Sequence, residues 1–252
     1  MSESRKSRLT FTILATVVRP AMNLMLGRSW DGTENLPKGG GFIACPNHVT
    51  EIDPLVVGHF FYNQGILPRY LAKASLFKVP VLGPALRATQ QVPVQRGGAG
   101  AAASLDGAQQ VIDAGGALIV YPEGTLTRDP GLWPMKGRTG AARLALQTGA
   151  PVIPIAHWGA QDLLPRYGKM LHLFPRKRVR LLVGKPVDLS DLRGVPLTKS
   201  VLEEATERIM AELTTLVASL RGETAPTERW DPSRKGQKAV GRGYDPQEEK
   251  KK

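Results

Sequence analysis

The chain has 252 residues, of which 42% are hydrophobic, so it can form one large globular domain or two small ones around a real core. Its 34 lysines and arginines exceed its 22 aspartates and glutamates, and this surplus favours polyanionic partners such as nucleic acid, an anionic lipid surface or a phosphorylated substrate. The single cysteine, Cys45, excludes an intrachain disulfide and a cysteine-based structural zinc site.

A basic start and an apolar run from Leu9 to Val18 form the N-terminal region. The run has about half of the roughly 20 residues needed to span a bilayer, because Arg19-Pro20 interrupts it, and no cleavage site of small residues follows. We therefore predict an amphipathic membrane-associating segment, residues 1–27, with helices at 8–18 and 20–27. The alternative is a helix that caps the core.

Short apolar runs alternate with helical patterns along the rest of the chain. Strands are predicted at 41–45, 69–73, 90–94, 117–121, 152–156 and 179–183. Helices are predicted at 54–61, 101–114, 139–147 and 198–220, with a short helical or irregular stretch at 79–87. This alternation is typical of an α/β fold in which helices flank a mostly parallel central sheet.

The composition changes after Gly222, where the chain becomes polar and rich in glycine, proline and charge. Such a segment cannot bury enough apolar surface to order itself. We expect three parts: the membrane-associating segment at 1–27, a folded domain at 28–221 and a disordered charged tail at 222–252.

Polar residues follow four of the predicted strands, at positions where active sites of α/β folds tend to lie. They are Asn47-His48, Lys73, Arg96 and Glu123-Gly124-Thr125. If the strands are parallel, these residues meet at one edge of the sheet and form a candidate site.

His48 and Asp53 are a histidine and a carboxylate at a short fixed spacing. A neutral imidazole can act as a base at neutral pH, and a carboxylate on its other nitrogen stabilises the imidazolium that results. The alternative is that Asp53 only caps the helix that begins near Pro54. Asn47 either orients His48 or forms part of a turn. The other three histidines have no comparable neighbours and are interpreted as structural.

The sequence offers no protein nucleophile for this base to activate. There is no GxSxG motif, and Cys45 lies within an apolar strand. A base without a protein nucleophile indicates that the substrate supplies one, such as a hydroxyl.

Two loops could bind an anionic substrate. Arg96 precedes a glycine-rich stretch at 97–100 and a helix, so backbone N–H groups and the guanidinium could face an anion; the alternative is a flexible turn. In the second loop, Glu123 could bind a substrate hydroxyl, and a backbone N–H near Gly124 could bind an oxyanion, although an ordinary turn also fits. Lys136 and Arg138 follow it and would suit a phosphate.

Four sequence blocks are more specific together than any one alone. They are NHVTEID at 47–53, VPVQR at 92–96, YPEGT at 121–125 and VIPI at 152–155. In order and spacing they resemble the glycerolipid acyltransferase family, in particular its lysophosphatidic acid (1-acylglycerol-3-phosphate) acyltransferases. The resemblance covers roughly residues 25–190.

The resemblance implies that His48, paired with Asp53, removes the proton from the sn-2 hydroxyl of 1-acylglycerol-3-phosphate. The hydroxyl would attack an acyl thioester, on coenzyme A or acyl carrier protein, without an acyl-enzyme, and give phosphatidic acid for phospholipid synthesis. No cofactor and no metal are implied. The substrate-binding residues implied are Arg96 for the phosphate, Glu123, Gly124 and Thr125 for the acceptor, and Lys73, Lys136 and Arg138 as further contacts.

Some positions depart from the family pattern and leave the acceptor open. Leu126 stands where arginine is common, Thr50 where serine is common and Tyr121 where phenylalanine is common. Glycerol-3-phosphate or another lysophospholipid is therefore an alternative acceptor.

The basic charge and the apolar N-terminus also bear on where the protein works. We expect a peripheral or monotopic protein on the cytoplasmic face of a membrane, in contact with an anionic lipid surface. The alternative of another class is a basic nucleic-acid-binding protein, but no recognition motif and few aromatic residues in basic stretches support it, so no nucleic-acid partner is expected.

Overall fold

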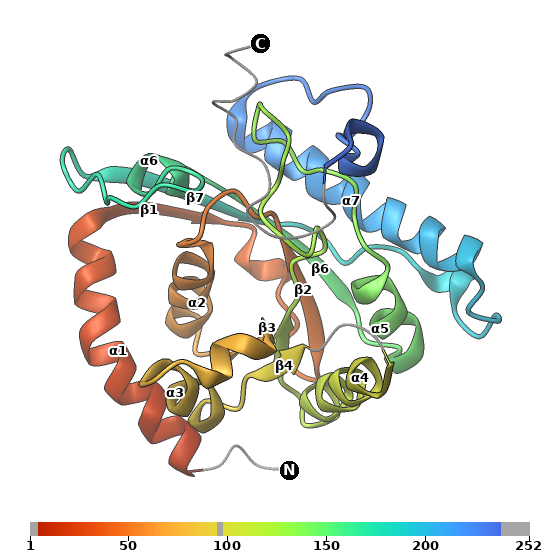
Figure 1. Cartoon of the computed structure of the whole chain (residues 1–252), viewed down its shortest axis with the longest axis horizontal. Coiled ribbons are helices and arrows are strands. Elements are labelled where there is room, and N and C mark those ends of the chain that lie inside the picture. Colours follow the sequence, from red (N-terminus) through yellow and green to blue (C-terminus); the bar gives the residue numbers. More distant parts are fainter. Residues whose placement is uncertain (1–4, 95–97, 238–252) are drawn as a thin grey trace.

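A computed structural model describes residues 5–94 and 98–237 of the chain (Figure 1). Its centre is one seven-stranded sheet with the strand order β1-β7-β6-β2-β5-β3-β4. All neighbouring strands are parallel except β6 and β7, which are antiparallel. The predicted α/β fold with a mostly parallel sheet is confirmed.

The strands are β1 (Leu26–Asp31), β2 (Phe42–Pro46), β3 (Pro68–Lys73), β4 (Val92–Val94), β5 (Ala117–Ile119), β6 (Val152–Trp158) and β7 (Lys177–Val183). The α-helices are α1 (Arg5–Met25), α2 (Asp53–Asn63), α3 (Leu82–Ala88), α4 (Gly98–Asp113), α5 (Gly140–Thr148), α6 (Ala160–Leu163) and α7 (Lys199–Arg221). Short 3₁₀ helices are η1 (Thr33–Asn35), η2 (Ala74–Lys78), η3 (Ser190–Leu192) and η4 (Pro232–Lys235).

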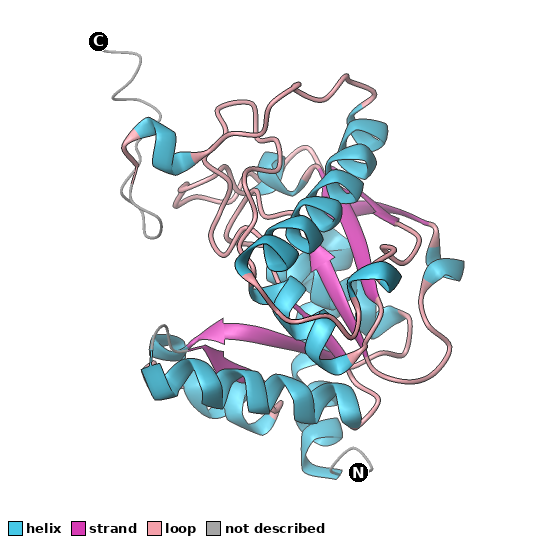
Figure 2. Ribbon diagram, turned by 90° about the vertical axis from the view of Figure 1, so that its right-hand side faces the viewer, coloured by secondary structure: helices cyan, strands magenta, loops and turns pink. Residues whose placement is uncertain are grey.

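Both faces of the sheet are buried, because alternate residues of each strand point to opposite sides. Ile43 and Cys45 of β2 pack with residues of α4, α5 and α7. Phe42 and Ala44 face the other way and pack with Phe60 and Phe61 of α2. Figures 1 and 2 show these two helical layers, with α4, α5 and α7 on one side of the sheet and α1, α2 and α3 on the other.

The N-terminal region differs from the expected helix pair. One helix, α1, continues through Pro20, and Met22 beyond it is buried against Leu26, Ile52 and Val56. This packing holds the second half of the helix in place although proline removes one helical hydrogen bond. No helix among the described residues has the length and apolar character needed to cross a membrane.

Strand β1 is the second difference, because no strand was predicted before residue 41. Residues 26–31 instead pair in parallel with 177–182 of β7. The local sequence has low strand propensity, so the pairing with β7 is what stabilises residues 26–31 as a strand.

The disordered tail predicted at 222–252 also differs from the structure over residues 222–237. Arg229 forms an ion pair with Glu207, and the carbonyl of Trp230 accepts a hydrogen bond from the Lys136 amide at 2.9 Å. Ala225 packs beside Trp133. These specific partners, which composition does not reveal, fix the segment. Residues 238–252 lie outside the described residues.

Candidate active site

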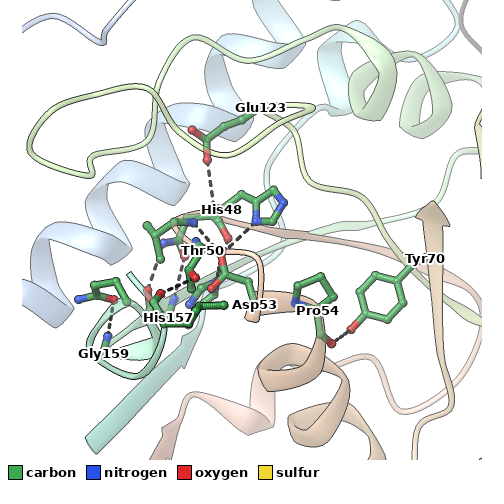
Figure 3. A network of polar contacts seen from close by, with 12 residues as sticks. His48, Thr50, Asp53, Pro54, Tyr70, Glu123, His157 and Gly159 are labelled. Carbon is green, nitrogen blue, oxygen red and sulfur yellow. Dashed lines mark hydrogen bonds and ion pairs between the residues drawn. The ribbon is translucent and has the colours of Figure 1, made fainter. Parts of the chain in front are cut away.

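The loop between β2 and α2 carries the predicted base and its carboxylate (Figure 3). His48 Nδ1 lies 3.0 Å from Asp53 Oδ2. Asp53 is fully buried, whereas the His48 side chain is 15% exposed. Because Nδ1 donates its proton to the carboxylate, Nε2 keeps its lone pair, and His48 lines the large cavity described below.

Asp53 does not act as a helix cap, which was the alternative to its role beside His48. Its Oδ2 accepts hydrogen bonds from the amides of Val49 at 2.6 Å and Thr50 at 2.9 Å, both of which precede α2. The residue before the helix is Ile52, and it provides no side-chain cap. Asp53 therefore closes the loop around itself and holds His48 within it.

Tyr121, which follows β5, restricts the imidazole from its flat side. The two rings are stacked with centroids 4.0 Å apart and an interplanar angle of 25°. Burial, together with the nearby Tyr70 and Asp53, raises the pKa of the Tyr121 hydroxyl well above its usual range. The stacked ring is therefore neutral, and it limits rotation of the base.

A second histidine, His157 at the end of β6, belongs to the same network, although it was interpreted as an isolated structural residue. Its Nε2 lies 2.8 Å from the carbonyl oxygen of Asn47 and 3.8 Å from Asp53 Oδ2. Asn47 Oδ1 accepts from the His157 amide at 2.8 Å, and Asn47 Nδ2 donates to the His157 carbonyl at 3.1 Å. Asn47 thus fastens the loop to β6. The sequence signal for the role of His157 in this network was its position near the end of a predicted strand.

Glu123 lies behind the loop and not in the cavity, which differs from its expected contact with a substrate hydroxyl. It is buried, and its Oε1 accepts from the His48 amide at 3.1 Å while Oε2 accepts from the Met135 amide at 3.0 Å. Burial raises the pKa of Glu123 to about 8, against the opposing effect of these hydrogen bonds. The side chain positions the backbone of the base.

Gly124 lines the cavity with a positive φ of 70°. Its own amide donates to the carbonyl of Tyr121 at 3.0 Å, so the expected oxyanion contact from an N–H near Gly124 is not made by this amide. A Cβ at this position would lie 2.6 Å from Arg138 Cδ, which shows that the Arg138 side chain crosses over the glycine. Thr125 follows it, half-buried, and is not part of the cavity wall.

The predicted cations fall into three groups. Lys73 and Arg138 are exposed and line the cavity. Lys136 is not part of the cavity wall, and its Nζ forms an ion pair with Asp231 Oδ2 at 2.8 Å. Arg96 lies outside the described residues. Only Lys73 and Arg138 are therefore brought near His48 by the structure described here.

The cavity has a volume of about 830 Å³ and extends from His48 between α1, α2 and α3. The part of its wall formed by His48, Glu51, Lys73 and Arg138 is termed the polar end, and Arg19, His59, Thr89 and Gln91 also line the cavity. The remainder is mostly apolar, with walls that include Phe11, Leu14, Val18, Leu55, Leu82 and Leu86. A base at one end and an extended apolar space at the other suit a substrate with a reactive hydroxyl and a hydrocarbon chain.

The remaining chemistry of the site is limited. Cys45 is fully buried in the core, and burial raises the pKa of its thiol, so it is not placed as a nucleophile. Across residues 5–94 and 98–237, no three histidine, cysteine or acidic side chains group in a way that could hold a metal ion.

Comparison with known proteins identifies the family of the chain. The family model described as Acyltransferase matches residues 28–158, just over half of the chain. The chain therefore belongs to the acyltransferase family, and it is an enzyme that transfers acyl groups. This membership favours the enzyme over the nucleic-acid-binding alternative.

Individual relatives share this family. The chain is 28% identical over 202 residues to the 1-acyl-sn-glycerol-3-phosphate acyltransferase of Bacillus subtilis, an alignment that covers 79% of this chain and 92% of the relative. It is 31% identical over 132 residues to the protein of the same name from Borreliella burgdorferi, which covers 52% and 51%.

A solved structure shows the same fold. It is the crystal structure of the 1-acyl-sn-glycerophosphate (LPA) acyltransferase PlsC from Thermotoga maritima, with a TM-score of 0.63 and 23% sequence identity. The match covers 90% of this chain and 86% of the other. The agreement extends over almost the whole chain and not only over the sheet.

Proposed function

We propose that the enzyme transfers an acyl chain from an acyl thioester to the sn-2 hydroxyl of 1-acylglycerol-3-phosphate and so forms phosphatidic acid. The observation that carries this proposal is the His48–Asp53 pair at the polar end of a large apolar cavity. The names of the relatives from Bacillus subtilis and Borreliella burgdorferi, both 1-acyl-sn-glycerol-3-phosphate acyltransferases, support it.

In the proposed reaction, His48 Nε2 removes the proton from the acceptor hydroxyl as its oxygen attacks the thioester carbonyl carbon. Asp53 stabilises the imidazolium that forms, since its carboxylate lies on the other ring nitrogen. The tetrahedral intermediate then collapses, the carbon–sulfur bond breaks, and the thiolate takes the proton from His48. The hydroxyl proton thus leaves on the thiol, and no acyl-enzyme is required.

The acceptor phosphate is proposed to lie near Arg138 and Lys73, which reach the cavity from different elements. Arg96, outside the described residues, and Thr125 remain proposed substrate contacts from the sequence. Charged hydrogen bonds from a guanidinium to a phosphate are among the stronger ones in proteins. A phosphorylated acceptor therefore fits this end of the cavity better than a neutral one.

The apolar part of the cavity is proposed to hold a hydrocarbon chain of the substrates. Its volume lies within the range of about 300–1,000 Å³ that is usual for ligand pockets. The leaving thiol belongs to coenzyme A or acyl carrier protein, and no cofactor takes part.

We also propose that the enzyme binds an anionic membrane surface peripherally, on its cytoplasmic face. One side of α1 lines the cavity with Phe11, Leu14 and Val18, while Ile13 and Val17 are exposed on the other side. A helix with apolar residues on both sides is usually covered on both. A lipid surface would cover the outer side and supply a lipid acceptor.

A panel of acceptors tests the proposed reaction. The purified enzyme would be given acyl-CoA or acylated acyl carrier protein together with lysophosphatidic acid, glycerol-3-phosphate, a lysophospholipid with a larger headgroup or monoacylglycerol. We expect the highest kcat/KM with lysophosphatidic acid. Equal values with monoacylglycerol would contradict a phosphate site, and a preference for glycerol-3-phosphate would favour the alternative acceptor.

A further inference from the structure

The loop between α6 and β7, residues 164–176, exposes apolar side chains that the proposed reaction does not use. Phe174 is 87% exposed and Met170 is 72% exposed, and Leu171 and Leu173 beside them are also exposed. None of the four lines the cavity. Four large apolar side chains within five residues form a cluster that usually marks a binding surface.

This α6–β7 loop lies next to the C-terminal end of α1. The Arg176 guanidinium donates to the carbonyl oxygens of Asn23 at 2.6 Å and Leu26 at 2.7 Å. Leu24, between these two residues, is 78% exposed. Figure 1 shows the loop projecting at the upper left, on the same edge of the molecule along which α1 runs. The exposed apolar residues of α1 and of the loop therefore border one surface.

The charged residues within the two segments that form this surface are all basic. Residues 5–28 and 165–180 contain no aspartate or glutamate. Within the described part of the chain, Lys169, Lys177 and Arg178 form no ion pair. Apolar side chains flanked by unneutralised cations complement a bilayer with anionic headgroups, where the cations meet phosphates and the apolar groups enter the acyl region.

The base of the α6–β7 loop is also attached to the loop that holds His48. Thr50 Oγ1 donates to the carbonyl of Leu164 at 2.5 Å, and Glu51 Oε2 accepts from the Tyr167 amide at 3.2 Å. Glu51 itself lines the cavity. A membrane contact at this loop would thus lie directly beside the polar end of the cavity.

We propose that the α6–β7 loop is a second membrane anchor, which inserts Met170 and Phe174 into an anionic bilayer alongside the outer face of α1. This inference rests on the proposed membrane association and assigns it a second contact. The loop would hold the polar end of the cavity against the surface from which a lipid acceptor enters.

A double variant tests the anchor directly. Met170→Asp with Phe174→Asp places two charges where burial in lipid is expected, at positions whose side chains are largely exposed in the fold. We expect its affinity for vesicles of equal parts phosphatidylglycerol and phosphatidylcholine to fall at least tenfold. Transfer to a lysophosphatidic acid embedded in those vesicles should fall with it, while transfer to a short-chain, monomeric acceptor should stay within twofold of wild type.

Two matched variants distinguish failure of the second anchor from failure of the proposed membrane association. Val195→Asp alters an exposed apolar residue in the segment between β7 and α7, at the opposite side of the molecule from α1, and should bind vesicles as wild type does. Val17→Asp with Leu24→Asp alters the outer face of α1. If this variant is released while the loop variant binds fully, the second anchor is wrong and the proposed membrane association stands. If wild type itself does not bind vesicles, both are wrong.

A fluorescent probe gives a readout that does not depend on weakened binding. Cys45 is fully buried, so a thiol-reactive dye on Phe174→Cys labels that position selectively. We expect its emission to shift to the blue on addition of the same vesicles, and no shift for the dye on Val195→Cys. An unchanged spectrum at position 174 with bound protein would overturn the proposal.

Discussion

The polar and apolar ends of the cavity are constructed in different ways. At the polar end, hydrogen bonds fix His48 on both its ring and its backbone, through Asp53 and Glu123. At the apolar end, side chains such as Leu14, Leu55 and Leu86 line the cavity from three separate helices and form no hydrogen bonds. Reacting atoms need fixed geometry, whereas a hydrocarbon chain needs only a matching apolar volume. Substitutions at the two ends should therefore change different kinetic quantities.

Asp53→Asn should have the largest effect of the changes that probe this comparison. It keeps the size of the side chain but removes the charge that stabilises the His48 imidazolium, and its amide group faces backbone N–H donors. We expect kcat to fall by about 10³-fold or more, by analogy with the loss of a carboxylate behind a catalytic histidine. Steady-state transfer to lysophosphatidic acid measures it, and a loss of less than tenfold would contradict the role of Asp53.

Glu123→Gln should have an intermediate effect on the rate. Glutamine retains one acceptor oxygen but sets an NH₂ group against either the His48 or the Met135 amide, which disturbs the backbone of the base. We expect kcat to fall by about 10- to 100-fold, while KM for the acceptor changes little because Glu123 does not line the cavity. A rise in KM alone would indicate a direct contact with the acceptor.

Glu123→Gln should also change the pH dependence of the free energy of unfolding. The pKa of Glu123 is about 8 in the folded chain and roughly 4.3 when unfolded, so between these values only the folded state keeps the proton. The free energy of unfolding should fall as pH rises through this window, by at most about 1.4 kcal/mol per pH unit. Denaturant unfolding at pH 5 and pH 8 should show a smaller fall for Glu123→Gln than for wild type; equal falls would contradict the shift.

At the apolar end, Leu86→Trp should change selectivity more than rate. The larger side chain would fill part of the cavity, and Leu86 takes no part in the hydrogen bonds that hold His48. We expect kcat/KM for long acyl thioesters to fall by about tenfold, because a missing or crowded methylene position changes the free energy by roughly 1–3 kcal/mol. The kcat/KM for short acyl thioesters should stay within threefold of wild type. Equal losses for all chain lengths would show that this end also controls the chemistry.

Lys136→Ala should have the smallest effect. Lys136 pairs with Asp231 at the surface, and this lysine helps to lower the pKa of Asp231 to about 2. Exposed ion pairs contribute about 0–1 kcal/mol, so we expect a small loss of stability that disappears at high salt and no change in KM for lysophosphatidic acid. An increased KM for lysophosphatidic acid would contradict this expectation and indicate that Lys136 contacts the phosphate.

The sheet and the active-site loop were predictable because their information is local. Apolar runs such as 41–45 marked the buried strands, and the spacing of His48 and Asp53 indicated their contact. β1 was missed because its order comes from pairing with β7, which is more than 140 residues away in the chain.

The direction of a side chain was harder to predict than its position. Glu123 stands at the end of a strand, as expected, but it turns inward because the Met135 amide, from a loop without regular structure, offers it a partner. The order of residues 222–237 likewise depends on individual contacts of Arg229, Trp230 and Asp231. Such contacts arise between distant segments, and neither composition nor periodicity encodes them.

The rate of acyl transfer by His48→Ala is the most direct test of the account. Alanine removes the base and leaves Asp53 bonded to the amides of Val49 and Thr50, so the loop should stay folded. With acyl-CoA and lysophosphatidic acid, we expect kcat to fall by at least about 10³-fold, while the unfolding transition remains close to that of wild type. A correctly folded variant that retains a tenth or more of the wild-type rate would show that His48 is not the base.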